Sequence, residues 1–325
     1  MSARPDAPNG TEFSCCICGH SSSKAGPGEL GRARGNTKRF RGTVYRLWKC
    51  PSCRSIHSLD PVDFAEIYSD YPLNERRLDV FARGTLANLL ARLKRAGLRP
   101  SDRILDYGCG NGVLLQFLKE RRFDNVAGYD PYVPKFSELP SGLFDCVVAN
   151  DLIEHVPDPR ATLRECAEKV APGGLLYVGT ADSEPVVMDD LEPQLMRLHQ
   201  PFHRVILTAD GLAGLARETG FELLRSYRRS YMDTRFPFAN YRFLDELNRA
   251  LDHELDAALD PASSSRAVMR SPRLWFFGVL GSFFPSADEP AVVLHRTGGS
   301  GATRAPESQV GAAAAGTRSS AAGNP

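Results

Sequence analysis

Two acidic residues flank a turn that has a glycine at every second position. Asp106 ends an apolar run, glycines follow at 108, 110 and 112, and Asp130 ends the next apolar run. Glycines permit positive φ angles and let a ligand approach the backbone, while amides at the following helix start favour electron-rich groups. An acid at the end of the second strand can accept hydrogen bonds from both hydroxyls of a ribose. The pattern predicts a nucleoside-cofactor site, although Asp106 can also serve to stabilise the turn.

Two Cys-x-x-Cys pairs form a second chemical group. Cys15 and Cys18 lie in one turn-like stretch, and Cys50 and Cys53 lie in another. Two such pairs can bring four thiolates to the corners of a tetrahedron, which is the geometry of structural zinc. In a reducing compartment this spacing favours a metal site over disulfides. We therefore expect one structural Zn²⁺, with a redox pair or coincidental cysteines as the alternative.

Histidines form the third group, because imidazole is the natural proton acceptor near neutral pH. His155 follows Glu154 directly after an apolar run, and His199 and His203 lie in a later loop. His155 and His203 are the candidate general bases. The alternative for His155 is a helix-start residue that only shapes a pocket, and the alternative for His203 is a structural hydrogen bond.

The apolar pattern predicts the elements that position these residues. Strands are expected near 103–107, 125–129, 144–150, 174–179, 221–227 and 291–295, the last as an edge strand, and helices near 112–121, 160–170 and 208–219. This alternation predicts a parallel α/β sheet. Only thirteen residues separate Asp130 from Phe144. That is too few for a further helix and strand, so we expect one element of the usual sheet to be missing.

Composition suggests the domain organisation. The stretches 1–12 and 298–325 contain scarcely any large apolar residues, so we expect disordered tails. Residues 13–58 are expected to form a zinc ribbon whose knuckles flank a loop rich in Gly, Ser and Arg, and 59–97 a helical linker or lid. The α/β domain then covers 98–297, with an insertion at about 230–288 that contains a charged helix over Tyr241–Leu259.

Four segments together resemble the class I S-adenosylmethionine-dependent methyltransferases. In chain order they are residues 103–114, 128–130, 144–159 and 170–178. The third leads into Glu-His-Val-Pro-Asp-Pro, which is typical of one branch of this family. The resemblance implies a Rossmann-like class I methyltransferase sheet with an N-terminal zinc ribbon and a helical insertion before the last strand. It also implies S-adenosylmethionine as the cofactor.

The same resemblance implies roles for individual residues. Asp106 and Gly108 would lie beside the methionine part of the cofactor, Gly110 and Gly112 would allow its close approach, Asp130 would hold the ribose, and Asn150 would border the methyl group. Methyl transfer to a hydroxyl or carbon acid also requires proton removal. We favour His203 over His155 as the base, because the loop of His203 is expected on the insertion side, which faces the acceptor.

The acceptor is expected to be a small molecule, and a sugar or sugar-nucleotide in glycan or secondary-metabolite biosynthesis is the first interpretation. The alternatives are an RNA methyltransferase that grips nucleic acid with its ribbon, and a non-catalytic scaffold. A net charge of +1, from 40 basic and 39 acidic residues, argues against nucleic acid.

No apolar run is long enough to cross a bilayer, so we expect a cytoplasmic protein. The apolar stretch 274–285, preceded by Arg270 and Arg273, is expected to fill a core, cover the substrate or contact a membrane interface.

Overall fold

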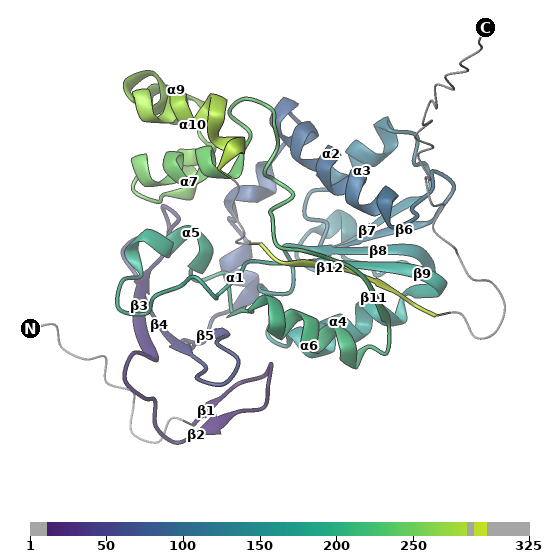
Figure 1. Cartoon of the computed structure of the whole chain (residues 1–325), viewed down its shortest axis with the longest axis horizontal. Helices are drawn as coiled ribbons and strands as arrows, with labels where there is room; N and C mark the ends of the chain where they lie inside the picture. Colours follow the sequence, from purple (N-terminus) through teal and green to yellow (C-terminus); the bar gives the residue numbers. More distant parts are fainter. Residues whose placement is uncertain (1–11, 285–288, 298–325) are drawn as a thin grey trace, which may run out of the picture.

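The main sheet is the feature around which the chain is organised. The computed structural model describes residues 12–284 and 289–297, so the expected tails, 1–12 and 298–325, lie outside the described residues except for residue 12. Within the described residues the sheet has six strands in the order β11-β12-β9-β8-β6-β7 (Figure 1). The strands are β6 (Ile104–Tyr107), β7 (Val126–Tyr129), β8 (Phe144–Asn150), β9 (Val170–Gly179), β11 (Glu222–Tyr227) and β12 (Ala291–His295). Strands β6 to β9 are parallel, and β12 runs antiparallel to both of its neighbours.

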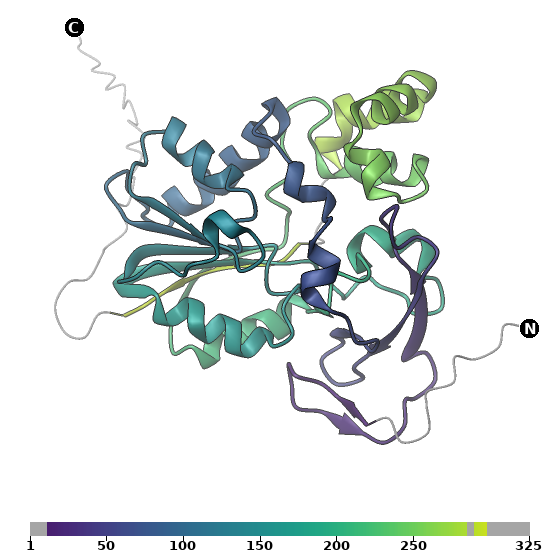
Figure 2. The same ribbon diagram turned by 180° about the vertical axis from the view of Figure 1, so that it is seen from behind.

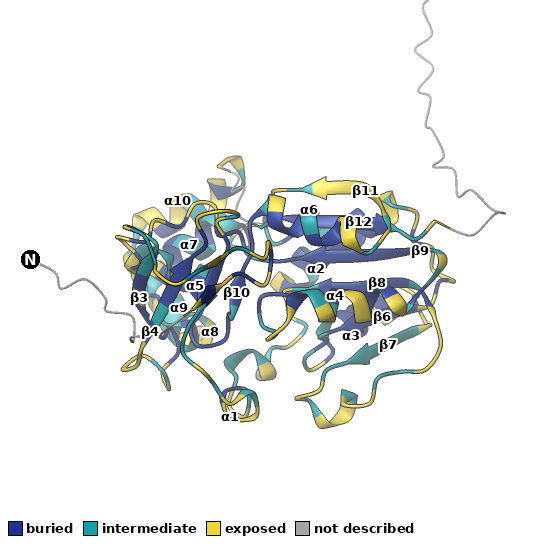
Figure 3. Cartoon of the chain, turned by 90° about the horizontal axis from the view of Figure 1, so that it is seen from below, coloured by how far each residue is buried: buried dark blue, intermediate teal, exposed yellow. Residues whose placement is uncertain are grey.

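Helices cover both faces of this sheet. They are α2 (Val80–Arg95) and α3 (Val113–Glu120) on one face, and α4 (Pro159–Glu168) and α6 (Ala209–Glu218) on the other. Alternate strand residues point to opposite faces. Thus Ile104 and Val148 pack in the core under α2 and α3, while Leu105 and Val147 pack in the core with α4 and α6. Figure 3 shows the central strands as the buried layer between the helices.

The position of β12 corrects one expectation. This strand was expected at the edge of the sheet, but it lies between β9 and β11. Its residues Ala291–Leu294 are all buried, and such a continuous apolar run suits a strand that is covered on both faces. The missing element is confirmed, because only the short helix η2 (Pro134–Phe136) separates β7 from β8 and β7 ends the described sheet.

The cysteine-containing region forms two small sheets. A hairpin of β1 (Phe13–Ser14) and β2 (Ser21–Ser22) carries the first knuckle. The second sheet has the order β10-β5-β4-β3, with β3 (Leu30–Arg34), β4 (Val44–Lys49), β5 (Ile56–Ser58) and β10 (Val205–Ile206). The stretch between the knuckles was expected to be a loop, but β3 forms within it. Strand β10 comes from far along the chain, and its Ile206 shares a core with Leu47 and Ile56. The ribbon is therefore built into the rest of the protein.

Short helices connect and cap these sheets. They are α1 (Phe64–Tyr68), η1 (Pro72–Glu75), η3 (Glu192–Gln194) and α5 (Leu195–Leu198). The insertion contains α7 (Tyr241–Ala250), α8 (Leu255–Leu259), α9 (Pro261–Arg270), α10 (Pro272–Leu280) and η4 (Gly281–Phe283). The charged helix expected over Tyr241–Leu259 is interrupted, because Asp252 and His253 adopt positive φ angles of 55° and 57°. None of the helices in the described residues is both long and apolar enough to cross a bilayer.

Candidate active site and cysteine cluster

The glycine turn joins the carboxyl ends of β6 and β7. The amides of Gly108 and Cys109 both donate to the carbonyl of Tyr129, at 2.7 and 3.1 Å. Gly110 has a φ of +51°, and a Cβ atom added there would have nothing within 4 Å. Gly112 has a φ of +86° and begins α3 as its N-cap. Gly110 therefore leaves room for a ligand to approach the backbone, whereas a Cβ atom on Gly108 would lie 2.8 Å from Leu152 and one on Gly112 would lie 3.0 Å from Phe136.

Asp130 lies at the end of β7 with both carboxylate oxygens directed toward the backbone. The amide of Gly110 donates to Oδ2 and the amide of Tyr132 donates to Oδ1, each at 3.0 Å. Each oxygen keeps lone pairs that two ribose hydroxyls can use. Asp106 is buried behind it, and burial together with the charge of Asp130 raises the pKa of Asp106 to about 7. A cationic ligand group beside Asp106 would favour its ionised form.

Asn150 and Asp151 end the neighbouring strand β8. The Asn150 side chain donates from Nδ2 to Oδ2 of Asp151 at 2.9 Å, and the hydroxyl of Tyr231 donates to the same oxygen at 3.0 Å. Asp151 has a φ of +51°, which a non-glycine residue rarely adopts. A Cβ atom on Gly179 would lie 2.5 Å from Oδ1 of Asn150, so glycine at 179 leaves room for this amide.

Sequence reasoning missed Asp151, Tyr231 and Arg76. The charge of Arg76 acts on Asp151 and Tyr231, which places this guanidinium near the end of β8. Asn111, in the glycine turn, donates to the carbonyls of Asn74 and Arg76 and so ties η1 to the cofactor turn. Asp151 could have been predicted, because it directly follows the predicted site residue Asn150. Arg76 and Tyr231 lie in stretches whose sequence carries no recognisable motif.

Three histidines from two segments of the chain meet at the same edge. The ring centroids of His155 and His203 are 4.6 Å apart, and those of His199 and His203 are 5.0 Å apart. The hydroxyl of Tyr68 lies 2.8 Å from Nδ1 of His155, and that of Tyr71 lies 3.1 Å from Nε2 of His199. The structure thus brings together the two candidate bases and the tyrosines of the α1–η1 segment.

The hydrogen bonds of His203 define its tautomer. Its Nδ1 lies 2.7 Å from the carbonyl of Arg197, and a carbonyl can only accept, so Nδ1 carries the proton and Nε2 keeps a lone pair. Burial lowers the pKa of His203 to about 4 and the pKa of His155 well below its ordinary value. Both rings are therefore neutral near pH 7. An imidazole of this kind can accept a proton.

Glu154 lies beside these rings, and both of its carboxyl oxygens accept hydrogen bonds from the protein. One of its oxygens accepts from the hydroxyl of Thr180 at 2.8 Å and the other from the amide of Ala181 at 3.3 Å. Ligand atoms of Glu154, His155 and His203 lie within 4.8 Å of one another. Burial raises the pKa of Glu154 to about 8, so its carboxyl holds a proton at neutral pH. We interpret this group as a hydrogen-bonding cluster.

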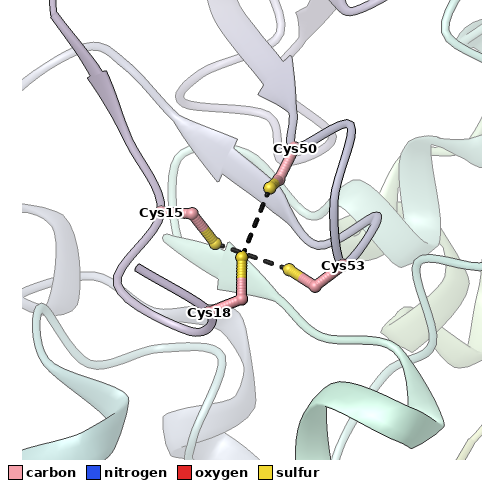
Figure 4. A group of neighbouring side chains, drawn as sticks. All are labelled: Cys15, Cys18, Cys50 and Cys53. Carbon is pink, nitrogen blue, oxygen red and sulfur yellow. Dashed lines mark hydrogen bonds between the residues drawn. The ribbon is translucent and has the colours of Figure 1, made fainter. Parts of the chain in front are cut away.

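The four expected cysteines lie together in the ribbon (Figure 4). Sγ of Cys15 is 3.5 Å from Sγ of Cys53, Sγ of Cys18 is 3.7 Å from Sγ of Cys50, and all four sulfurs lie within 4.8 Å of one another. Tetrahedral zinc with bonds of about 2.3 Å holds its sulfurs about 3.8 Å apart. The four thiols therefore fit a zinc ion.

The two knuckles have the same backbone geometry. The amide of Gly19 donates to the carbonyl of Cys15, and the amide of Arg54 donates to the carbonyl of Cys50, both at 2.9 Å. Gly19 and Arg54 both have positive φ angles, of 76° and 63°. Nε2 of His57 lies 3.2 Å from Sγ of Cys15, where a ring N–H would stabilise a thiolate.

Known proteins share the methyltransferase-like part of the chain. Residues 76–226 match a family described as a methyltransferase domain. The ubiquinone biosynthesis O-methyltransferase of Pseudomonas aeruginosa (strain UCBPP-PA14) is 29% identical over 160 residues, which cover 40% of this chain and 68% of that protein. The protein of the same name from Xanthomonas oryzae pv. oryzae (strain PXO99A) is 32% identical over 172 residues, which cover 45% of this chain and 61% of that protein.

Among solved structures, magnesium protoporphyrin IX methyltransferase from Synechocystis with bound S-adenosylmethionine shares 18% identity, with a TM-score of 0.38 over 51% of this chain and 90% of that chain. This structural likeness is weak. The family match and the curated relatives identify residues 76–226 as part of an S-adenosylmethionine-dependent methyltransferase domain.

Proposed function

We propose that the chain transfers the methyl group of S-adenosylmethionine to a hydroxyl group of a small molecule. The observation that carries this proposal is the tautomer of His203. Its Nδ1 donates to the carbonyl of Arg197, so its Nε2 keeps a lone pair. A hydroxyl attacks a methyl group well only when a base removes its proton. His203 is neutral at physiological pH and lies at the carboxyl edge of the sheet, so it suits this role. The curated relatives are named O-methyltransferases, which accords with a hydroxyl acceptor.

The cofactor supplies an electrophilic methyl group when it is bound, and this chain's residues position it. Asp130 would accept hydrogen bonds from the ribose hydroxyls, and the open space at Gly110 would admit the cofactor. Asp106 balances the positive charge of the methionine part, and Asn150 borders the methyl group. Arg76, on the segment tied to the turn by Asn111, pairs with the cofactor carboxylate.

His155 has a positioning role in this proposal. Its Nδ1 forms a hydrogen bond with the hydroxyl of Tyr68, and its ring packs edge-on to that of His203. His199 continues the network, because its Nδ1 lies 2.8 Å from Oδ1 of Asn36 in the ribbon. The ribbon therefore helps to hold the base in place.

The structural Zn²⁺ belongs to the same proposal. Ligation by Cys15, Cys18, Cys50 and Cys53 would fix the two knuckles, and β3, which lies between them in the chain, leads to Asn36, whose side chain contacts His199. Because reduced thiols are needed, we propose a cytoplasmic location. We also propose residues 13–58 as the ribbon, 59–97 as a helical linker whose α2 packs on the main sheet, and 98–297 as the methyltransferase domain.

The acceptor hydroxyl belongs to a ring compound in this proposal. The sequence suggested a sugar or sugar-nucleotide, and the names of the relatives suggest a precursor in quinone biosynthesis. Tyr71 is partly exposed and its ring lies beside those of His155 and His199, so it offers an aromatic surface on which either kind of ring can pack.

Methyl-transfer assays with two acceptor panels test the proposal. One panel contains sugars and sugar-nucleotides, the other catechols and related phenols, and mass spectrometry locates the added methyl group. We expect O-methylated product from one panel and release of S-adenosylhomocysteine, both reduced in Asp130→Ala at limiting cofactor concentration. Methylation only at nitrogen or carbon would contradict the hydroxyl acceptor while leaving the cofactor site intact.

A further inference from the structure

The outer side of α10 presents a continuous apolar surface. We call it the α10 face, and its members are Trp275, Phe276, Val279, Leu280, Phe283 and Phe284, with exposed fractions from 40% to 77%. Their spacing of one, four, five, eight and nine residues from the first places them on one side of a helix that η4 continues. Isolated exposed apolar residues are common on protein surfaces. Six on one helix face indicate a binding surface.

The opposite side of α10 is fixed to the insertion. Leu274 is buried in a core with Phe243 and Leu247 of α7. A Cβ atom on Gly278 would lie 2.3 Å from the ring of Phe238, so glycine permits this close packing. The side chain of Asn240 donates to the carbonyl of Phe277 at 2.9 Å. These contacts hold the α10 face outward.

Charge is distributed unevenly along the insertion. Residues 261–284 contain Arg266, Arg270 and Arg273 and neither Asp nor Glu, whereas residues 241–260 contain six acidic residues. Arg273 pairs with Glu246 of α7, while Arg266 and Arg270 are exposed. Figures 1 and 2 show α9 and α10 as the outermost layer of the insertion, with α7 between them and the rest of the protein. The outer layer is therefore apolar and cationic, and α7, which has two acidic and two basic residues, lies behind it.

We propose that the α10 face docks on an anionic lipid surface. A helix of nine residues cannot span a bilayer, but it can lie in the plane of the interface with its apolar side among the acyl chains. Trp and Phe side chains favour the interface, and arginines at its margin attract anionic headgroups. The combination of an apolar stripe with cations and no acid on α9 and α10 complements such a membrane.

The insertion also connects this surface to the active-site edge. Tyr231, which donates to Asp151, begins the segment that leads to Asn240 and α7. Asn88 of α2 donates to the carbonyls of Tyr231 and Asp233 and so anchors the start of this segment. A chain docked through α10 would therefore hold the end of β8 at a defined orientation to the lipid surface. The docking itself does not depend on which acceptor is methylated.

Vesicle binding by the full chain tests the proposal. The probes are vesicles of phosphatidylcholine with phosphatidylglycerol and vesicles of phosphatidylcholine alone, measured by flotation and by tryptophan emission. The chain has two tryptophans, of which Trp48 is buried and Trp275 is 51% exposed. Insertion of α10 should therefore shift the emission of Trp275 to shorter wavelength. We expect binding to the anionic vesicles, weakened by salt.

Matched variants distinguish lipid docking from self-association through the same face. Phe276→Glu with Phe283→Glu should lower the vesicle partition coefficient by about tenfold or more, because binding follows the apolar area buried. Val187→Glu, which changes a valine that is 59% exposed elsewhere, should leave it unchanged. The proposal is overturned if the wild type does not bind anionic vesicles, or if the double variant binds as well as the wild type. It is also overturned if sedimentation shows a wild-type dimer that the double variant dissociates while neither binds vesicles.

Discussion

Two substitutions of His203 separate catalysis from structure. The amide of asparagine reaches the position of Nδ1, so His203→Asn can still donate to the carbonyl of Arg197 but lacks Nε2. The amide of glutamine reaches the position of Nε2, so His203→Gln loses the bond to Arg197 and places no proton acceptor of comparable basicity at that point. Neither variant can act as a base near neutral pH. Only the glutamine variant loses the hydrogen bond to the carbonyl of Arg197.

The magnitudes follow from these two functions. Loss of a general base should slow methyl transfer by about 100- to 10,000-fold in both variants, which corresponds to about 2.7 to 5.4 kcal/mol on the barrier. Loss of the hydrogen bond to the carbonyl of Arg197 should lower the free energy of unfolding of the glutamine variant alone by about 0.5 to 1.5 kcal/mol. Affinity for S-adenosylmethionine should change little in either, because a base acts on the barrier and not on cofactor binding.

The pH dependence adds an independent check. Burial lowers the pKa of His203 to about 4, and the protonated ring cannot accept a further proton. With saturating S-adenosylmethionine, which would keep Asp106 ionised, activity should therefore rise with pH through this value and be level from about pH 6 to pH 7, below the pKa of about 8 of Glu154. A base with an ordinary imidazole pKa would instead titrate near 6.5.

The assays are single-turnover methyl transfer, calorimetric binding of the cofactor and chemical denaturation. Normal turnover in His203→Asn would refute the role of His203 as base and leave it a structural residue. A rise in activity centred near pH 6.5 in the wild type would place the base on another group.

Three further predictions concern the metal, the ribose and the end of β8. Cys50→Ser should reduce bound zinc from one per chain to near zero by elemental analysis, while Cys16→Ser, outside the cluster, should retain it. Asp130→Ala removes two ribose hydrogen bonds, so the Kd for the cofactor should rise by about 5- to 150-fold in calorimetry; an unchanged Kd would place the ribose elsewhere. Gly179→Ala should displace the Asn150 amide and slow turnover by up to about 100-fold, whereas Gly214→Ala, with open space around it, should not.

The sequence by itself determined the features that depend on neighbouring residues. The glycine turn, its flanking acids and the two cysteine knuckles are each encoded within a few residues, because turn geometry and metal-ligand spacing are local. The buried strands could also be predicted, because an apolar run bounded by turn residues is visible in the sequence whichever element packs on it in the fold. The missing element after Asp130 followed from chain length alone, and the structure confirms it.

Only the tertiary structure decided which distant segments meet. Strand β10 completes the sheet of the ribbon, and β12 enters between β9 and β11, because both satisfy backbone hydrogen bonds that no local pattern assigns to a partner. The same holds for the histidine cluster: Tyr68 contacts His155 and Asn36 contacts His199 across 87 and 163 residues of chain. Burial at that junction, and not residue type, lowers the pKa of His203 and makes it a neutral proton acceptor.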